Sequence, residues 1–401
     1  MKRSSRFPSE AKLEGVIGRN KTMKKEIELY LHIPFCARKC AYCDFLSFPQ
    51  GREVQRRYVD RLIEEIETAS AGFRDTTVTS VFVGGGTPSI LESGEIVRIF
   101  EALRHTFSIE ETAEISMEAN PGTVTREKLL DYRRAGINRL SFGLQSADDT
   151  ELAALGRIHT YEEFLESYRM ARECGFTNIN VDLMSALPGQ TVESWLTTLK
   201  KVAALEPEHI SAYSLIIEEG TPFFEQYGDE RGEGILPDED SEREMYHQTK
   251  KVLKELGYER YEISNYAKPG YECRHNVGYW TGVSYLGLGL GASSYINGCR
   301  FQNTGDLEVY LNGEIGKHQD EIVLDEKDLQ EEFFFVGLRM VRGVSLRRFE
   351  EQFGVTAESV YPGLLERLIR EGGAEMQGEW FRLTEYGMDV SNYIMAQFLQ
   401  D

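Results

Sequence analysis

Six short β-branched or aromatic runs, each followed by apolar residues at helical spacing, constrain the fold of this 401-residue chain more than any other feature. The runs cover residues 29–33, 79–83, 114–118, 139–142, 178–183 and 209–214. Such alternation indicates parallel strands joined by right-handed helical crossovers. Six units are too few to close a barrel of eight strands. We therefore predict an α/β fold built on an open, partial, TIM-like (β/α)6 barrel.

The end of the chain follows a different pattern, in which helical spacing is succeeded by a hairpin that turns at Gly378. The helical patterns cover residues 328–340, 345–354 and 364–369, and the hairpin covers 374–383. Three helices and a hairpin indicate a smaller, winged-helix-like C-terminal domain, which we assign to residues 326–401. Because the net charge is −21, we interpret this domain as a packing or docking module rather than a DNA reader.

A C-x3-C-x2-C triplet follows the first predicted strand, at Cys36, Cys40 and Cys43. Three thiolates on one short loop can hold three corners of a [4Fe–4S] cube, because soft sulfur ligands suit iron–sulfur clusters. The fourth iron would then lack a protein ligand and could bind a small molecule. A structural zinc site is the alternative, but it usually groups its four ligands as two pairs. The remaining cysteines stand alone in the sequence: Cys174, Cys273 and Cys299.

Polar groups stand at the ends of several predicted strands. A glycine-rich turn, Gly84-Gly85-Gly86-Thr87-Pro88, follows the second strand and allows a ligand to approach the backbone closely. Glu118, Gln145 and Asp182 lie late in the next three strands. Burying such groups is costly unless they find partners. One of them could belong to a structural network, whereas three on neighbouring strands favour a ligand.

Together, these motifs resemble the radical S-adenosylmethionine superfamily, and Tyr30-Leu-His-Ile-Pro-Phe-Cys36 resembles its oxygen-independent coproporphyrinogen III oxidase group. The resemblance runs from about Tyr30 to the C-terminus. It implies a [4Fe–4S] cluster on the cysteine triplet, with S-adenosylmethionine chelating the open iron. The residues that it assigns to S-adenosylmethionine are Tyr30, Tyr42, Gly85, Gly86, Thr87, Glu118, Gln145, Arg157, Asp182, Ile216 and Ala292. Arg157 is a candidate through the resemblance alone.

Two departures separate the branches of this group. The cysteine motif of coproporphyrinogen oxidases resembles C-x3-C-x2-C-x-C, whereas Phe45 occupies the place of the fourth cysteine in this chain. Those oxidases also resemble one another in a longer segment before the first strand, where this chain has only a polar extension. The run from Arg274 to Trp280 resembles the His-Asn-x-x-Tyr-Trp signature of the HemW-type heme chaperones. An imidazole such as that of His275 can ligate heme iron, and Tyr279 and Trp280 offer flat faces to a macrocycle. Alternatively, His275 is a satisfied polar residue and the aromatic residues belong to the core.

The resemblance therefore implies a heme chaperone that binds heme and transfers it to an acceptor protein, which the sequence does not identify. One alternative is an oxygen-independent coproporphyrinogen III oxidase, which would remove two propionate carboxylates by radical chemistry. A second alternative is a radical enzyme that acts on heme itself. In each case residues 27–240 would form the radical S-adenosylmethionine barrel, and residues 241–325, with the His-Asn-x-x-Tyr-Trp motif, would complete it.

Composition sets the remaining expectations. With 41% hydrophobic and 28% charged residues, the chain is typical of globular proteins. No apolar run could span a membrane, and a clustered cysteine trio fits a reducing compartment, so we predict a cytoplasmic protein. We expect at most peripheral contact with membrane heme proteins. The net charge of −21 predicts that the protein has no nucleic-acid partner. We expect a monomer or weak homodimer. The polar, basic residues 1–26 predict a disordered extension, in which either Met1 or Met23 is the natural start.

Overall fold

The computed structural model of the protein describes residues 25–69, 72–73 and 75–400. Most of the predicted N-terminal extension, including the possible start at Met23, lies outside these ranges. Lys25 and Glu26 belong to the first strand and pair with its neighbour, so this strand begins before its predicted limit at residue 29.

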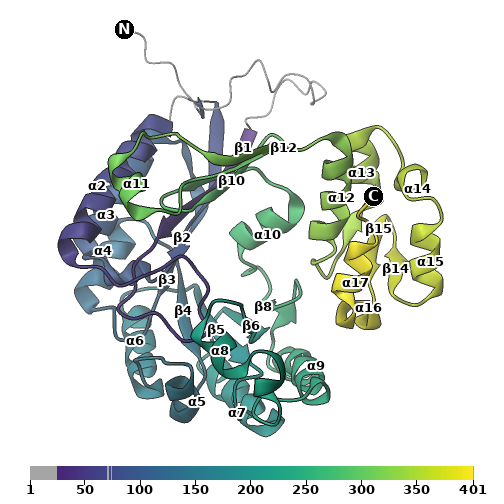
Figure 1. Ribbon diagram of the computed structural model, residues 1–401, viewed down its shortest axis with the longest axis horizontal. Helices are drawn as coiled ribbons and strands as arrows, with labels where there is room; N and C mark the ends of the chain where they lie inside the picture. The colour runs from purple at the N-terminus through teal and green to yellow at the C-terminus, as the bar shows by residue number, and fades with distance from the viewer. Residues whose placement is uncertain (1–24, 70–71, 74, 401) are drawn as a thin grey trace.

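Six parallel strands form the middle of the main sheet (Figure 1), which has twelve strands among the described residues. Their bounds are β1 (Lys25–Ile33), β2 (Thr76–Gly85), β3 (Ile109–Ala119), β4 (Arg139–Gln145), β5 (Ile179–Ser185) and β6 (His209–Ser214). They lie in chain order, each paired in parallel with the next. All six predicted strands are thus confirmed, together with their parallel pairing.

Short strands from the region after β6 extend both edges of this core. Beyond β6 lie β8 (Asn265–Ala267) and β7 (Glu259–Arg260), and beyond β1 lie β9 (Tyr285–Leu288), β10 (Ser293–Ile296), β11 (Cys299–Gln302) and β12 (Gln319–Val323). Among these, only β9 runs parallel to its neighbour, β1. In the described sheet, β12 and β7 form the two free ends, so the barrel is open, as predicted.

Helices cover the outer face of the sheet (Figure 1). The elements between β1 and β7 are α2 (Arg52–Ala69), η2 (Pro88–Ile90), α3 (Ser93–Thr106), α4 (Arg126–Arg134), α5 (Asp149–Ala154), α6 (Tyr161–Glu173), α7 (Val192–Ala203), α8 (Pro222–Tyr227), η3 (Asp229–Gly232) and α9 (Glu239–Glu255). Alternate strand residues explain the packing, since Leu29 and Leu31 of β1 share one buried core with Tyr58 and Leu62 of α2. Aliphatic side chains at every second position fit a pleated surface covered by helices.

The inner face of the same strands is polar. Glu28, Glu114 and Arg139 point away from the helical layer and are nonetheless buried. Helix α10 (Arg274–Thr281) lies against this face, with Gly278 so close to Glu28 that an added Cβ would lie 2.1 Å from the carboxylate. The region after β6 therefore contributes a helix that lies on the inner side of the open barrel (Figure 1).

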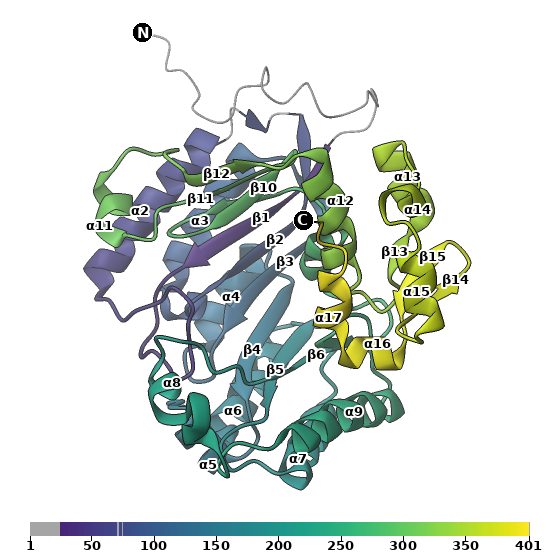
Figure 2. The ribbon, with the colours of Figure 1, turned by 45° about the vertical axis from the view of Figure 1, so that its right-hand side comes forward.

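The C-terminal domain has its own sheet and core (Figure 2). After α11 (Leu307–Asn312) it comprises α12 (Glu326–Gly337), β13 (Val344–Ser345), α13 (Leu346–Phe353), α14 (Ala357–Val360), α15 (Leu364–Arg370), β14 (Ala374–Gln377), β15 (Trp380–Leu383), α16 (Glu385–Asp389) and α17 (Ser391–Ala396). Phe334 and Phe398 stack at its centre, with ring centroids 4.3 Å apart. Gly378 turns the predicted hairpin with φ of +62°, and β13 adds a third strand to it. Helices packed on three short strands match the predicted winged-helix-like arrangement.

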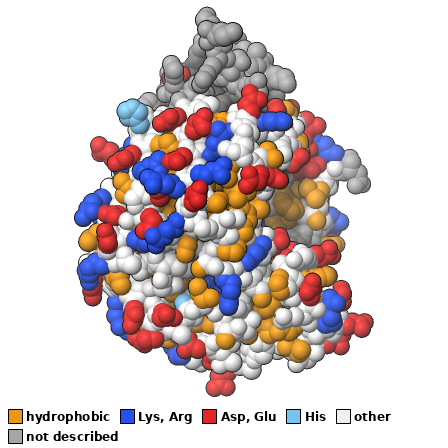
Figure 3. All heavy atoms as spheres, turned by 60° about the vertical axis from the view of Figure 1, so that its left-hand side comes forward, with side chains coloured by type: hydrophobic (Ala, Val, Ile, Leu, Met, Phe, Trp, Pro, Cys, Tyr) orange, Lys and Arg blue, Asp and Glu red, His pale blue; other side chains and the backbone are white. Residues whose placement is uncertain are grey.

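Acidic and basic side chains are interspersed over the face shown in Figure 3, which also has a hollow where hydrophobic side chains are exposed. This mixture agrees with a chain that has 66 acidic and 45 basic residues. Within the described ranges, no helix combines the length and apolar composition that a bilayer crossing requires.

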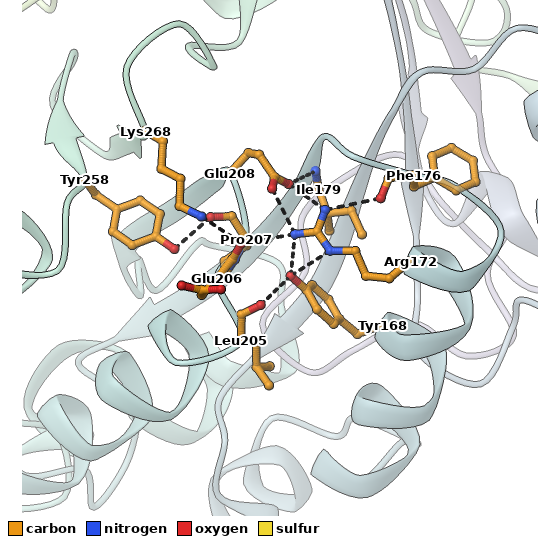
Figure 4. A network of polar contacts seen from close by, with 10 residues as sticks. All are labelled: Tyr168, Arg172, Phe176, Ile179, Leu205, Glu206, Pro207, Glu208, Tyr258 and Lys268. Atoms are coloured by element: carbon orange, nitrogen blue, oxygen red, sulfur yellow. Dashed lines mark hydrogen bonds and ion pairs between the residues drawn. The ribbon is translucent and has the colours of Figure 1, made fainter.

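A polar network fixes the connection that leads from α7 into β6 (Figure 4). Arg172 of α6 binds both carboxylate oxygens of Glu208, at 2.8 and 3.1 Å, and also the hydroxyl of Tyr168 and the carbonyl of Glu206. Glu208 in turn accepts the backbone N–H of Ile179 at 3.0 Å. Bidentate arginine–carboxylate pairs combine charge with fixed geometry. The network thus sets where β6 begins beside β5.

Arg172→Ala should lower the free energy of unfolding by about 1–2 kcal/mol, because Glu208 and the carbonyls of Glu206 and Phe176 would lose their charged partner. Urea unfolding followed by circular dichroism measures this change. Arg169→Ala is the matched control, since this arginine lies on the same helix in an exposed pair with Glu162. Equal destabilisation by the two variants would contradict the proposed structural role of the network.

Candidate functional site

The loop that follows β1 carries the three cysteines and is fastened on both sides. The backbone N–H of Cys36 donates to the carbonyl of Phe48 (3.2 Å), and the carbonyl of Ala41 accepts from the N–H of Phe223 (3.0 Å). Ala41 also donates to the carbonyl of Leu155 (3.3 Å). All three cysteines are free thiols and none is fully buried. The loop therefore presents three accessible sulfurs at the carboxyl end of the first strand.

In the described part of the chain, no three His, Cys, Asp or Glu side chains converge to hold one ion. The three thiols on this loop are soft sulfur donors of the kind that iron–sulfur clusters prefer. Their donor chemistry is therefore compatible with the predicted cluster.

The glycine-rich turn after β2 lies directly against this loop. The N–H groups of Gly86 and Thr87 donate to the carbonyls of Ile33 (2.8 Å) and Phe35 (2.7 Å). A Cβ on Gly86 would lie 2.7 Å from the carbonyl oxygen of Phe35 and 3.0 Å from Sγ of Cys36. Only glycine permits this close approach, so the turn serves to seat the cysteine loop.

A chain of hydrogen bonds connects two of the cysteines. The Thr87 hydroxyl donates to Sγ of Cys36 (3.6 Å) and accepts from the side-chain amide of Asn120 (2.8 Å). The amide oxygen of Asn120 accepts from Arg157 (2.9 Å), which also donates to Sγ of Cys40 (3.6 Å). Donors aimed at sulfur stabilise thiolates and sulfur ligands. Thr87 and Arg157, both predicted site residues, are thus brought together around the cysteines.

Two carboxylates face the interior above this chain. Glu118 accepts the backbone N–H of Gly85 at 3.1 Å, and Asp182 accepts from Ser141 (3.0 Å) and Asn180 (2.8 Å). Burial, together with the negative charge of Asp182, raises the pKa of Glu118 to about 8. Two carboxylates held near one another lower the free energy of a bound cation and raise that of an anion. A cation bound here would favour the ionised form of Glu118 over the protonated one, so this part of the site suits a positively charged ligand.

Gln145 occupies a strained position at the end of β4. Its φ is +75°, a conformation that residues other than glycine rarely adopt, and the β4–β5 register shifts between Gly143 and Gln145. The Tyr213 hydroxyl donates to its side-chain oxygen at 2.9 Å. Strain and strand irregularities of this kind occur preferentially at functional sites. The amide is thereby held at the carboxyl edge of the sheet, as predicted.

Tyr30 and Tyr42 flank the cysteine loop. The Tyr30 hydroxyl lies 3.0 Å from Nδ1 of His32, whose Nε2 lies 2.8 Å from the carbonyl of Leu46, within the loop. Tyr42 packs against Phe223, with ring centroids 6.3 Å apart. Burial raises the pKa of both phenols, so both remain protonated at neutral pH.

The last two predicted residues lie apart from this group. Ile216 follows β6 and is 68% exposed, so its side chain points largely to solvent. Ala292 is buried after β9, which flanks β1 on the side opposite to β2.

His275 lies inside the molecule, with both ring nitrogens in hydrogen-bonding distance of a partner. Nδ1 is 2.8 Å from the hydroxyl of Ser80, Nε2 is 3.0 Å from that of Tyr279, and the ring stacks on Phe82. Burial and the positive charge of Arg139 lower the pKa of His275 to about 3, so the imidazole is neutral. Ligation of heme iron by this ring would require one of the two hydrogen bonds to break.

The neighbouring aromatic residues lie at the surface of α10 that faces the C-terminal domain. Trp280 lies under the guanidinium of Arg339, 4.4 Å from its ring centroid, and within the described residues its indole N–H is buried without a hydrogen-bond partner. Tyr279 packs edge-on against Tyr285, with centroids 4.6 Å apart. Both residues line a cavity between the two parts of the protein.

Comparison with known proteins agrees with this geometry. Residues 30–202 match the model of the radical SAM superfamily, and residues 324–390 match that of the HemN C-terminal domain. The protein named heme chaperone HemW from Lactococcus lactis is 34% identical over 94% of this chain and 99% of its own length. The HemW protein of Bacillus subtilis is 35% identical over 92% of this chain and 98% of its own. This chain belongs to the HemW family.

The HemW assignment extends to the three-dimensional fold. The structure of coproporphyrinogen III oxidase (HemN) from Escherichia coli, described as a radical SAM enzyme, superimposes with a TM-score of 0.83 and 26% identity. The match covers 99% of this chain and 94% of the oxidase. HemW and HemN chains therefore share both the open barrel and the C-terminal domain, and the fold does not separate a carrier from an oxidase.

Two members of the HemW site were missed in the sequence. Asn120, which joins Thr87 to Arg157, follows Glu118 by two residues, and this period of two places it on the same strand face. Arg139 begins β4 and is only 2% exposed, between the carboxylates of Glu114 and Asp182. An arginine that opens an otherwise apolar strand is the signal that could have identified it.

Glu118→Gln should stabilise the ligand-free protein at pH 8 and leave its stability nearly unchanged at pH 5. The carboxyl has a folded pKa of about 8 against an ordinary value of 4.5, so the folded state binds more protons between these values and stability falls as the pH rises through them. Glutamine keeps an acceptor for Gly85 and removes this dependence, which gives a gain in stability at pH 8 of about 3–4 kcal/mol relative to pH 5. Thermal unfolding at the two pH values measures it.

The exposed Glu101 of α3 offers a control, since Glu101→Gln should not change the difference between the two pH values. A Glu118→Gln effect that is the same at pH 5 and pH 8 would show that the buried carboxyl is not protonated in the folded protein.

Proposed function

We propose that this chain is a heme chaperone, which binds heme and transfers it to an acceptor protein, and that it carries a [4Fe–4S] cluster with S-adenosylmethionine at the open iron. The observation that carries the proposal is the likeness over nearly the full length to several proteins named heme chaperone HemW. The acceptor is a heme protein whose identity the chain does not reveal.

Cys36, Cys40 and Cys43 would hold the cluster. The donor chemistry fits, because three free thiols stand on one loop and soft sulfur ligands suit iron–sulfur clusters. The close seat at Gly86 and the donors from Thr87 and Arg157 also fit a loop shaped for sulfur ligands. When bound, such a cluster can supply single electrons to a ligand at its open iron.

The strand ends next to the cysteines would hold S-adenosylmethionine. This ligand carries a sulfonium and an amino group, and the paired carboxylates of Glu118 and Asp182 suit a positively charged molecule. The full set that we propose is Tyr30, Tyr42, Gly85, Gly86, Thr87, Glu118, Gln145, Arg157, Asp182, Ile216 and Ala292. Ile216 and Ala292 are the two whose side chains lie apart from the others, so any contact from them involves the backbone.

The His-Asn-x-x-Tyr-Trp motif would contribute to heme binding. Tyr279 and Trp280 present aromatic faces toward the C-terminal domain, and His275 holds the hydroxyl of Tyr279 through Nε2. We therefore assign His275 a positioning role. In this scheme residues 27–240 form the cofactor-binding barrel, residues 241–325 complete it and residues 326–401 form a separate domain.

Phe45 favours a carrier over an oxidase. It stands two residues after Cys43, at the position where the motif of coproporphyrinogen oxidases has a fourth cysteine. Its side chain is 70% exposed beside the cysteine loop. The likeness to the HemN structure keeps coproporphyrinogen oxidation as the second candidate, and a direct assay separates the two.

Anaerobically reconstituted protein should contain about four irons per chain, since one cube fills the triplet. Replacing Cys36, Cys40 or Cys43 with serine should abolish its visible absorption and reduce bound iron by at least about tenfold. Cys174→Ser is the control, because this cysteine ends α6 away from the loop. Loss of the cluster in the control variant would indicate a fourth protein ligand and leave no open iron.

The reconstituted protein should bind about one heme per chain and form no protoporphyrinogen from coproporphyrinogen when reductant and S-adenosylmethionine are supplied. An oxidase must hold the reacting carbon within near-attack distance of the cofactor, and a carrier need not. Heme titration by absorbance and product analysis by chromatography measure the two activities in one preparation. Repeated turnover to protoporphyrinogen would favour the oxidase, and failure to bind heme would refute the chaperone proposal.

A further inference from the structure

A cavity of about 300 Å3 separates α10 from the C-terminal domain. Tyr279, Trp280 and Tyr285 line one wall, and Phe333 and Trp380 line the other. Its volume lies at the lower end of the range for small-molecule sites, which are concave and mostly apolar with a few polar groups. Aromatic residues on both walls suit a flat, hydrophobic ligand.

Two arginines stand together at the rim of this cavity. Arg342 follows α12 and lies over the ring of Trp380, with its guanidinium carbon 5.3 Å from the centroid. Arg348, in the first turn of α13, donates to the carbonyl of Thr281 at 2.9 Å. Partial burial and the positive charge of Arg348 lower the pKa of Arg342, so the two guanidinium groups lie close enough to repel.

Neither of these arginines forms an ion pair with a carboxylate in the part of the chain that the structure describes. This is unexpected in a protein with 66 acidic and 45 basic residues. Nearby arginines do find partners: Arg300 binds Glu332 at 2.9 Å, and Arg347 binds Glu379 at 3.3 Å. Two adjacent, unpaired guanidinium groups beside an aromatic cavity form an anion-binding rim.

We propose that heme binds in this cavity, with its flat ring between the aromatic walls and its carboxylate side chains paired with Arg342 and Arg348. This inference rests on the proposed function and adds to it where the ligand lies and which groups recognise it. Heme combines the two properties that the cavity selects, a flat apolar macrocycle and two carboxylates at one edge. The small volume leaves part of the ring in solvent, which suits a ligand that is handed to another protein.

A larger neighbouring cavity fits this ligand less well. It measures about 730 Å3, and its lining mixes the carboxylates of Glu26, Glu28 and Glu272 with four arginines, Arg260, Arg274, Arg342 and Arg382. Among the described residues, Tyr261 is the one aromatic residue of this lining, so the cavity lacks the opposed aromatic faces that a flat ring requires. The space beside the cysteines is far smaller than either cavity, at about 20 Å3.

The test compares hemin with hemin dimethyl ester, in which both carboxylates are blocked. The wild-type protein should bind hemin at least about tenfold more tightly than the ester. Arg342→Ala and Arg348→Ala should each weaken hemin binding about fivefold, and both variants should bind the ester as the wild-type protein does. Arg347→Ala is the matched control, since it removes a paired arginine of the same helix. Val336→Trp, which fills the cavity, should weaken binding of both ligands. Thermal unfolding of each variant checks that it is folded.

The outcomes separate this inference from the proposed function. If the wild-type protein binds hemin and the double arginine variant binds it equally well, the site is elsewhere and the chaperone proposal stands. Equal affinity of the wild-type protein for hemin and its ester would also overturn the site. If the wild-type protein binds neither ligand, the chaperone proposal fails and this inference fails with it.

Discussion

The inner face of the central sheet carries charged side chains that are shut off from solvent, and much of the surrounding structure satisfies them. Arg139 is 2% exposed and is surrounded by Glu114, Asp182 and the thiol of Cys273. An unpaired charge at such a place would cost several kcal/mol, at least about 3 by the usual effect of breaking a buried pair. The N-terminal end of helix α10 supplies partners for Glu114, because the thiol of Cys273 and the backbone N–H of Arg274 donate to its carboxylate. The open barrel therefore needs this helix to be stable.

The polar residues on the inner face of the strands fall into two groups, one near the amino ends of the strands and one near their carboxyl ends. Near the amino ends, α10 covers Glu28 and Glu114 and closes them off. Near the carboxyl ends, Glu118 accepts from Gly85 of the glycine-rich turn and Gln145 accepts from Tyr213, next to the cysteine loop. Parallel strands in chain order bring these ends to one edge, which is why residues far apart in sequence meet there. The contacts that stabilise the barrel and the proposed ligand site thus lie at different ends of one surface.

The sequence predicts this edge well, because it depends on strand order and on residues with a local signal. The six strands are continuous β-branched runs, and the cysteine triplet and glycine turn lie directly after two of them. The short outer strands β7 and β10, with two and four residues, are too brief for a periodicity to appear. The network of His275 is not predictable either, since Ser80 lies 195 residues away and is joined to it only by tertiary packing. Sequence alone could not decide between a heme ligand and a buried, satisfied imidazole.

A series of ring contacts connects the two proposed sites. Tyr30 stacks on Phe82 (6.4 Å between centroids), Phe82 stacks on His275 (5.3 Å), and His275 meets Tyr279 edge-on (4.7 Å). The series begins beside the cysteine loop and ends at the aromatic wall that faces the C-terminal domain. Packed rings have few alternative arrangements, so a displacement at one end requires an adjustment at the other. If a ligand at the cysteine edge changes the affinity of the cavity for its own ligand, the ligand in the cavity must change the affinity of the cysteine edge by the same factor. His275 is central to this series, and its neutral, doubly hydrogen-bonded ring suits a fixed connecting element better than an exchangeable iron ligand.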